Sequence, residues 1–491
     1  MEPIGTITAY FSLVEDDTQV ILESTMEEAQ NFREFVDILC ASVLDEKPSD
    51  ELIFFAVHFA ALLFDFNLIN RIADKYSSLS IIRPNLFYGS AFQGKHEDFR
   101  KVREAADNVM ATGPPDWLKL EMYIVKLEAE NEEYPKELYD SSTHDAIENM
   151  IKRKPEFGFY KSRVLDSLSI RAIRDGDTDQ ALELNQRAIQ NAEEHNDFNR
   201  LAHLLRTRAS ILQSSNREVS HELLRRSHVL LKSMGDKGGM GDVLFLLSKL
   251  ESIQGNYDRA IEYNLECIVI WQSIGMPTGM FGLTLSTLYN LIGDQNTALE
   301  WAKMAESELL SKPMLQPRAV LNQAWALAES GKILKARQLV DSIRDSILKS
   351  GLESNLGWLY LIDSIIEPLE GNYYSAANHV EESLDIYERA RGYFSYYICL
   401  HQRAKIEVSS IDLETTLTKT EQPGTWLLLL EEKARKENLQ GLLAQALILQ
   451  VEFFNKVGNE FKAESVLEEL KDLMKEGEFS FLESRVKELE R

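Results

Sequence analysis

A short element built on glycine and alanine recurs along this sequence and constrains the fold more than any other feature. It is clearest in the stretch from Gly255 to Ala260, where alanine stands five places after glycine. Glycine readily adopts the left-handed conformation that ends a helix, and the polar residue after it can cap the next helix. The same spacing returns at Gly176 and Ala181, Gly293 and Ala298, Gly331 and Ala336, Gly371 and Ala376, and Gly458 and Ala463.

The distance between successive glycines gives the size of the repeating unit. Gly255, Gly293, Gly331 and Gly371 are separated by 38, 38 and 40 residues, and the 79 residues from Gly176 to Gly255 hold two periods. An apolar stretch with helical periodicity precedes each glycine, and the alanine lies in the helix that follows. Each period therefore predicts two antiparallel helices joined by a short turn, and we expect an all-α chain.

Small residues recur at two further positions of the repeat and mark where the paired helices should touch. Seven places before the glycine stand Ser169, Ser248, Ser286, Ala324 and Ser364. Twelve places after it stand Ala188, Cys267, Ala305, Ile343 and Ser383, of which only the isoleucine is large. Small side chains let helix axes approach to the close end of the roughly 8–10 Å range. Five copies in phase favour this interpretation over an ordinary amphipathic bundle.

This pattern resembles the tetratricopeptide repeat family, in which a small residue, a glycine turn and a helical alanine follow one another in this order. The period here is about 38–40 residues rather than 34, similar to the helical arrays of kinesin light chains and prokaryotic regulators. The resemblance implies a right-handed α-solenoid of antiparallel helix pairs whose repeats contact chiefly their neighbours. It predicts a degenerate helical region at 1–156, six repeats at 157–395, and further helix pairs with a loop insertion at 412–424 and a capping helix within 396–491.

In that family the first helix of each pair lines the concave side, so the resemblance also implies a set of groove residues. The region of Trp325 and Trp358 is apolar and aromatic, which suits an amphipathic helix or an extended segment as partner. The alternative is that these side chains pack between turns of the superhelix. The candidate groove residues are Arg163, Asp166, Ile170, Arg174, Leu205, Ala209, Gln213, Phe245, Lys249, Leu283, Thr287, Asn290, Leu321, Trp325, Trp358, Leu361 and Ile365.

The charge of the chain argues against two classes of partner. Lys and Arg number 53 against 79 Asp and Glu, which gives a formal net charge of −26. Binding to a nucleic-acid backbone or to an anionic membrane surface needs clustered cations. We therefore expect no nucleic acid and no membrane as partner. The apolar run at 52–64 contains His58 and is too short to span a bilayer, so it predicts a buried core helix.

Cysteine usage and the N-terminal residues favour a cytoplasmic protein. Cys40, Cys267 and Cys399 are far apart and form no closely spaced pair, which is typical of a reducing compartment. The first residues carry no cationic region, so no signal peptide is expected.

Residue patterns typical of catalysis are missing from the sequence. It has no phosphate-binding loop motif, no zinc-protease helix motif and no nucleophile-elbow motif. His203, His221 and His228 fall on neighbouring helices, but no carboxylate or cysteine is placed to complete a metal site. We therefore expect no enzyme activity, no metal and no cofactor.

One neighbourhood of this acidic chain is basic. Such a patch can meet an acidic peptide segment or the chain's own acidic N-terminal part, and the alternative is a solvated face that balances its neighbours. Its members are Arg200, Arg206, Arg208, Arg217, Arg225, Arg226 and Lys232.

Together these features predict a non-catalytic scaffold or adaptor that binds another protein or a peptide segment along the concave face. The alternative is a regulatory or sensor module that binds a small ligand or a signal peptide in the groove. A closed pocket of a few hundred Å³ would favour the small ligand, and an open channel would favour the peptide.

Overall fold

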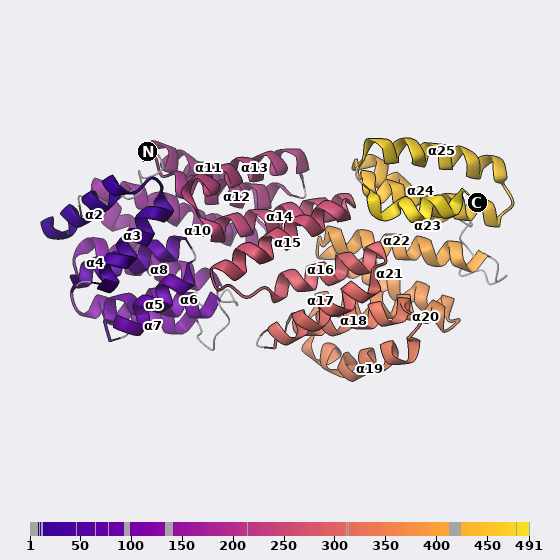
Figure 1. The fold of residues 1–491 in the computed structure, drawn as a ribbon, viewed down its shortest axis with the longest axis horizontal. Coiled ribbons are helices and arrows are strands. Elements are labelled where there is room, and N and C mark those ends of the chain that lie inside the picture. The colour runs from indigo at the N-terminus through magenta and orange to yellow at the C-terminus, as the bar shows by residue number, and fades with distance from the viewer. Residues whose placement is uncertain are drawn as a thin grey trace. The chain divides into compact units, whose positions relative to one another are not determined.

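The computed structural model describes residues 8, 10, 13–45, 47–63, 65–76, 78–92, 99–132, 141–213, 215–310, 312, 314–411, 424–477 and 479–490. These residues form helices and short connections without a strand, so the predicted all-α class is confirmed. Consecutive helices pack as antiparallel pairs (Figure 1). None of the described helices is both long and apolar enough to cross a bilayer. The loop predicted at 412–424 lies, apart from Gly424, outside the described residues.

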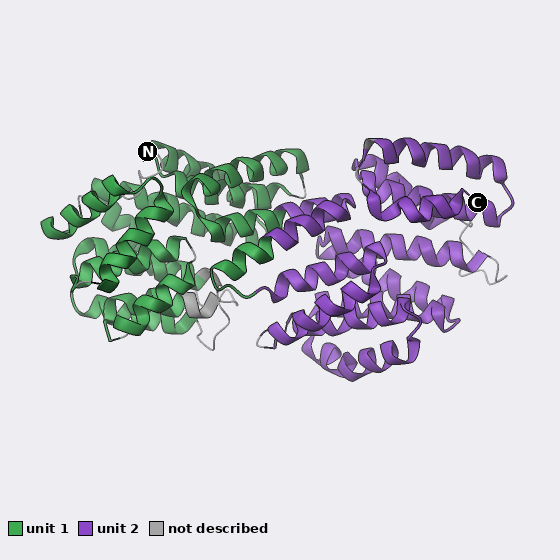
Figure 2. Cartoon of the chain, viewed as in Figure 1, with its two compact units in different colours: residues 1–246, 267–277 green, residues 247–266, 278–491 purple. Residues whose placement is uncertain are grey.

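The chain divides into two compact units (Figure 2). Unit 1 comprises residues 1–246 and 267–277, and unit 2 comprises residues 247–266 and 278–491. The helices α14 (Lys237–Gln254) and α15 (Tyr257–Ser273) contribute residues to both units. The three segments predicted from the repeats follow the sequence pattern rather than compactness, and that division stays a prediction.

Most helices of unit 1 come from the N-terminal half of the chain. They are α2 (Asp16–Glu28), α3 (Phe32–Asp45), α4 (Asp50–Leu62), α5 (Phe66–Tyr76), η1 (Ser80–Ile82), α6 (Arg83–Phe92), α7 (Phe99–Ala111), α8 (Asp116–Glu132), α9 (Ser141–Arg153), η3 (Pro155–Tyr160), α10 (Lys161–Arg174), α11 (Thr178–Glu194), α12 (Phe198–Leu212) and α13 (Arg217–Met234).

The helices of unit 2 continue the array of pairs. They are α16 (Gly279–Ile292), α17 (Gln295–Glu308), α18 (Gln316–Glu329), α19 (Ile333–Ser350), α20 (Glu353–Leu369), α21 (Tyr373–Arg389), α22 (Tyr393–Ser410), α23 (Thr425–Lys436), α24 (Gln440–Lys456), α25 (Glu460–Glu476), η5 (Ser480–Leu482) and α26 (Glu483–Leu489).

The repeated glycine ends the first helix of a pair in the conformation that the sequence predicts. All six glycines of the element have a positive φ, between 73° and 86°. Asp177, Asp294 and Asn459 then cap the next helix by accepting from a backbone N–H three residues on. Lys332 and Asn372 make no side-chain cap, so the predicted cap is wrong at these two turns.

The alanine of each copy lies where the paired helices meet, and in all six copies it is buried. The small residue of the first helix adds a hydrogen bond in two copies. Ser169 Oγ donates to the carbonyl oxygen of Ala181 over 2.8 Å, and Ser248 Oγ donates to that of Ala260 over 2.9 Å. A larger side chain at these places would push the helices apart, so the predicted packing role is confirmed.

The apolar run at 52–64 forms α4, and every residue of α4 from Leu52 to Ala60 is buried. Ser49 caps this helix by accepting from the backbone N–H of Leu52 over 3.2 Å. The predicted core helix is confirmed, and it carries His58 into the interior of unit 1.

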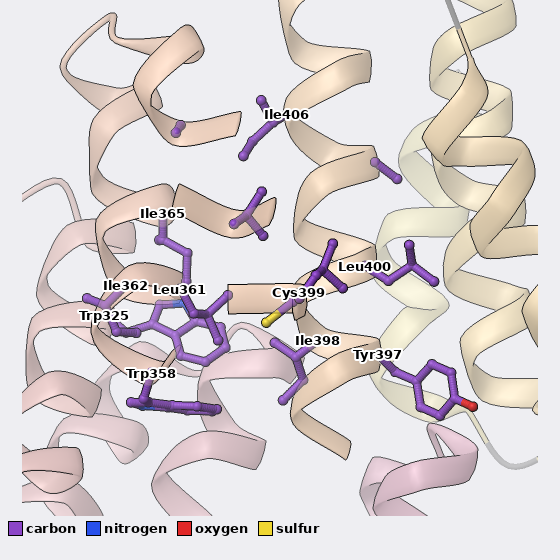
Figure 3. Packing of buried hydrophobic residues seen from close by; sticks show 14 of the residues in the cluster. Trp325, Trp358, Leu361, Ile362, Ile365, Tyr397, Ile398, Cys399, Leu400 and Ile406 are labelled. Carbon is purple, nitrogen blue, oxygen red and sulfur yellow. The ribbon is translucent and has the colours of Figure 1, made fainter. Parts of the chain in front are cut away.

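Unit 2 is built around a core of aromatic and aliphatic side chains (Figure 3). Trp358 of α20 is fully buried, and its ring centroid lies 6.3 Å from that of Trp325 on α18. Buried residues of α22, among them Ile398 and Leu400, continue the same core. Side chains from α18, α20 and α22 therefore pack against one another.

One contact within unit 2 joins residues that are far apart in the chain. A Cβ built on Gly255 would lie 2.6 Å from the carbonyl carbon of Gly441 at the start of α24. Close by in sequence, Asp258 Oδ2 accepts a hydrogen bond from Ser480 Oγ over 2.9 Å. The first residues of unit 2 thus pack against its C-terminal helices, in addition to the contacts between neighbouring repeats that the sequence predicts.

Gly255 and Gly331 form a matched pair for testing this close approach. Both have positive φ, 81° and 77°, but nothing lies within 4 Å of a Cβ built on Gly331. We expect Gly331→Ala to cost about 1–2 kcal/mol, the usual cost of a left-handed residue with a side chain. Gly255→Ala should cost about 1–3 kcal/mol more, because its methyl group overlaps backbone. Urea unfolding followed by circular dichroism measures both losses, and equal values would contradict the contact.

Candidate functional site

The predicted groove residues around the two tryptophans lie in the core of unit 2. Leu321, Trp325, Trp358, Leu361 and Ile365 are at most 5% exposed and belong to the core that Figure 3 shows. These side chains thus pack inside the unit and do not line an open groove. The sequence left such packing as the alternative to a groove. Their role in binding stays a prediction.

The polar groove candidates of α16 are used for hydrogen bonds inside unit 2. Asn322 Nδ2 donates to Thr287 Oγ1 over 2.9 Å and to the carbonyl oxygen of Leu283 over 3.3 Å. Asn290 Nδ2 donates to the carbonyl oxygen of Asn322 over 3.2 Å. Asn322 Oδ1 in turn accepts from Trp358 Nε1 over 2.9 Å. Buried polar groups require such partners, so Asn322 holds α16, α18 and α20 together.

Three other groove candidates, Arg163, Asp166 and Ile170 of α10, line a cavity within unit 1. Its volume is about 330 Å³, which lies near the lower end of the range of small-ligand sites. Its apolar lining includes Leu62, Phe66, Tyr88, Phe159, Ile170, Trp271 and Met276. Its polar lining includes Tyr10, His58, Asn85, Glu128, Arg163, Asp166, Ser167, Asp197, Asn199, Arg200, His203, Arg206 and Asp242.

Arg163 is fixed by two carboxylates of α8. It donates to both oxygens of Glu121, over 2.9 and 3.2 Å, and to Glu128 over 3.0 Å. Glu121 is fully buried and also accepts a hydrogen bond from the Tyr10 hydroxyl over 2.7 Å. Burial alone would raise the pKa of Glu121, but the charge of Arg163 and the hydrogen bond from Tyr10 help to lower this pKa to about 2. Glu121 is therefore charged, and breaking its pair with Arg163 would leave an uncompensated buried charge.

His58 and Tyr10 border this ion pair in their uncharged forms. Burial lowers the pKa of His58 and raises the pKa of Tyr10 well above its ordinary value. His58 Nε2 lies 3.1 Å from the Tyr10 hydroxyl oxygen, whose single proton is donated to Glu121. Nε2 therefore carries the hydrogen of the neutral imidazole and donates it to Tyr10.

Two arginines reach the cavity from α12. Arg200 donates to Asp166 Oδ2 over 3.3 Å and lies 3.6 Å from Glu128, and Arg206 pairs with Asp242. Both belong to the basic neighbourhood that the sequence singled out. Arg200 thus lies close to Glu128 of the acidic N-terminal region, and the role of the basic neighbourhood stays a prediction.

Asp166 Oδ1 and Asn85 Nδ2 are buried polar atoms of the lining that have no hydrogen-bond partner among the described residues. Both residues are 6% exposed. A buried polar atom without a partner costs about 1–3 kcal/mol, and more when it carries charge. This acceptor and this donor are therefore groups of the cavity to which a bound ligand would form hydrogen bonds.

The remaining groove candidates do not line this cavity. Leu205 is buried in a cluster formed by α10, α11 and α12, and Ala209 is also buried. Arg174 and Lys249 are exposed, Phe245 is half-buried, and Gln213 is half-buried at the end of α12.

The remaining arginines of the basic neighbourhood do not share one environment. Arg208 donates to the carbonyl oxygen of Leu182 over 3.4 Å, and Arg217 is half-buried at the start of α13. Arg225 and Arg226 are exposed, and Arg226 lies 3.8 Å from Glu193. A role of these arginines in contacting a partner stays a prediction.

Sequence reasoning did not identify Tyr10, Asn85 or Glu121. A signal existed for Glu121, which stands seven residues before Glu128 on a predicted helix and so shares a helix face with it. Tyr10 and Asn85 offered no comparable signal, because no repeat register covers the first 156 residues.

No protein-family model matches the sequence, and a search of curated proteins found no match. Among solved structures the chain is similar to a signal transduction ATPase with numerous domains and a tetratricopeptide repeat sensor from Pyrococcus horikoshii. The identity is 13% and the TM-score 0.46, over 75% of this chain and 54% of that chain, so this chain spans about half of the ATPase.

Two further solved structures are similar to this chain. One is a Rap protein complexed with competence and sporulation factor, with 11% identity and a TM-score of 0.43 over 68% of this chain and 99% of that chain. The other is yeast Tom70, with 11% identity and a TM-score of 0.35 over 98% and 95%. The tetratricopeptide-like fold of the chain rests on the helix pairs, left-handed glycine turns and buried alanines described above.

Proposed function

We propose that this chain is a non-catalytic recognition protein whose cavity in unit 1 binds a small polar ligand or the end of a short peptide. The observation that carries the proposal is a cavity of about 330 Å³ in which, among the described residues, Asp166 Oδ1 and Asn85 Nδ2 lack a partner. A volume of this size suits a small ligand or a peptide end better than a long segment. The proposal therefore favours the sensor or regulatory module over the scaffold.

The cysteines support a non-catalytic role. Cys40, Cys267 and Cys399 are all buried, and burial raises the pKa of Cys40 and of Cys399 to about 12. Because the thiolate is the reactive form, these two thiols are not nucleophiles near neutral pH. A cytoplasmic location and partners other than nucleic acid or membranes remain predictions from the sequence.

Filling the cavity tests the proposed function. Ala61 lines the cavity near the end of α4, so Ala61→Phe should occupy part of it. The full chain would be screened against small metabolites and short peptides by differential scanning fluorimetry. A ligand at a hundredfold excess over its Kd stabilises the folded state by about 2.7 kcal/mol. We expect ligands whose stabilisation is lost in Ala61→Phe and kept in Ala111→Phe, which adds the same ring at the exposed end of α7.

A second cavity variant keeps the test valid if Ala61→Phe does not fold. Ile170→Phe narrows the same cavity from α10, and circular dichroism would establish that both variants keep the helix content of the wild type. Ligands that stabilise the wild type and both cavity variants equally would contradict the proposed site. A screen without any stabilising ligand would contradict the proposed function itself.

A further inference from the structure

We infer that the cavity of unit 1 binds a protonated amine, whose ammonium group pairs with Asp166. This inference rests on the proposed function and adds the chemical class of the ligand. A small amino compound and the N-terminus of a peptide both carry such a group, so the shared chemistry is an ammonium attached to an apolar body.

The charge of the lining favours a cation over an anion. Four carboxylates line the cavity, at positions 128, 166, 197 and 242, against three arginines at positions 163, 200 and 206, and the lining contains no lysine. Two more carboxylates bond to lining residues from behind, Glu121 to Arg163 and Asp236 to His203. Together these six carboxylates outnumber the three arginines of the lining. A cation gains from this excess and an anion is repelled by it.

The arginines of the cavity are already engaged. Arg163 is bonded to Glu121 and Glu128, and Arg200 is bonded to Asp166. An anionic ligand would have to displace one of these carboxylates, and the displaced carboxylate would stay buried without a counter-charge. The arginines therefore hold the carboxylates in place rather than offering a site to an anion.

Asp166 is the acceptor that this arrangement leaves open. Its Oδ2 receives one long bond from Arg200, over 3.3 Å, while Oδ1 has no partner among the described residues. Its side chain is only 8% exposed, so bulk water does not supply the missing bonds freely. An ammonium group has three N–H donors, and a bond from one of them to a carboxylate is charge-assisted and strong.

The second unpartnered atom and the apolar walls define the rest of the ligand. Asn85 Nδ2 is a donor, so it would bond to a carbonyl oxygen on the same ligand. Ile170, Phe159 and Met276 provide an apolar surface for a side chain, and aromatic faces additionally attract cations. An amino group, a carbonyl and an apolar side chain occur together in an amino-acid amide and in the first residue of a peptide.

Calorimetric titration of the full chain with paired probes tests the inference. The probes are leucinamide, phenylalaninamide and leucyl-glycyl-glycinamide, each compared with its N-acetylated form at pH 6.5, where the free amino group is protonated. Acetylation removes the charge and two donors and keeps the rest of the probe. We expect the free amines to bind at least tenfold more tightly than the acetylated probes. The two single-residue amides compared with the tripeptide distinguish a small amine from a peptide N-terminus.

A matched pair of variants locates the binding of the amine. Asp166→Asn should weaken binding of the free amines at least tenfold and leave the acetylated probes unaffected. Asp179→Asn removes a carboxylate from the exposed start of α11 and should change neither. If Asp166→Asn does not fold, the comparison of free and acetylated probes on the wild type still shows whether the ammonium group is recognised.

Two outcomes would overturn the inference and leave the proposed function standing. Equal binding of free and acetylated probes would show that the charge is not recognised. Ligands from the fluorimetric screen that depend on the cavity but are neutral or anionic, together with no binding of the amines, would show that the cavity has a different specificity. The failure of the proposed function is recognised separately, because no ligand would then respond to Ala61→Phe or Ile170→Phe.

Discussion

Replacing Trp358 by alanine is expected to destabilise unit 2 by about 3–5 kcal/mol, the usual cost of deleting a large buried aromatic side chain. Trp358 is fully buried, its Nε1 donates to Asn322 Oδ1, and the Arg318 guanidinium lies 4.5 Å from its ring centroid. The substitution therefore leaves a cavity and takes away the donor of a buried amide oxygen. The loss should appear as an earlier midpoint in urea unfolding followed by circular dichroism.

Two control variants separate the contributions of Trp358. Tyr374→Ala removes a ring from the same unit, but Tyr374 is 66% exposed, so we expect a loss below about 0.5 kcal/mol. Trp358→Phe keeps much of the packing and removes the N–H, so the loss should be about 1–3 kcal/mol. An unchanged midpoint for Trp358→Ala would contradict its position in the core and would support its predicted position in the groove.

Replacing Glu121 by glutamine is expected to destabilise unit 1 by about 3–5 kcal/mol, although the two side chains have nearly the same shape. Glu121 is fully buried and accepts from Arg163 and Tyr10. The amide has no charge to offset that of Arg163, and its NH₂ group cannot accept the bonds that a carboxylate oxygen accepts. Thermal unfolding and urea unfolding of the full chain would both report this loss.

Glu148→Gln is the matched control in the same unit. Glu148 pairs with Lys152 one turn away on the surface of α9, and its side chain is 47% exposed. Exposed pairs of this kind contribute about 0.3–0.5 kcal/mol. If the two substitutions lower the free energy of unfolding equally, Glu121 does not carry a buried charge. The pairing that holds Arg163 in the cavity wall would then be contradicted.

The helix pairs could be predicted because their determinants are local. Gly176 and Ala181 lie five residues apart, and the turn and the close contact that they specify both form within a single repeat. The same register named Arg163, Asp166 and Ile170 as residues of a first helix, and all three line the cavity. Local spacing is thus sufficient for the fold of each pair and for part of one wall of the site.

The rest of the site depends on contacts that no local pattern records. The Tyr10 hydroxyl meets His58 and Glu121, which are 48 and 111 residues away in the chain. The two tryptophans show that a correct register does not determine which side chains are accessible. The register assigned Trp325 and Trp358 to the groove side of the repeats, but only the packing of α18, α20 and α22 decides whether that side is open.

The contact of Gly255 with Gly441 bears on how unit 2 folds and unfolds. In an array where repeats touch only their neighbours, the terminal repeats can fray one at a time. Here Asp258 and Ser480, 222 residues apart in sequence, are hydrogen-bonded, so the last helices are tied to the first residues of the unit. Making this tie requires the closure of a very long loop, which slows folding. Once made, it favours unfolding of unit 2 as one cooperative block rather than by peeling from its C-terminal end.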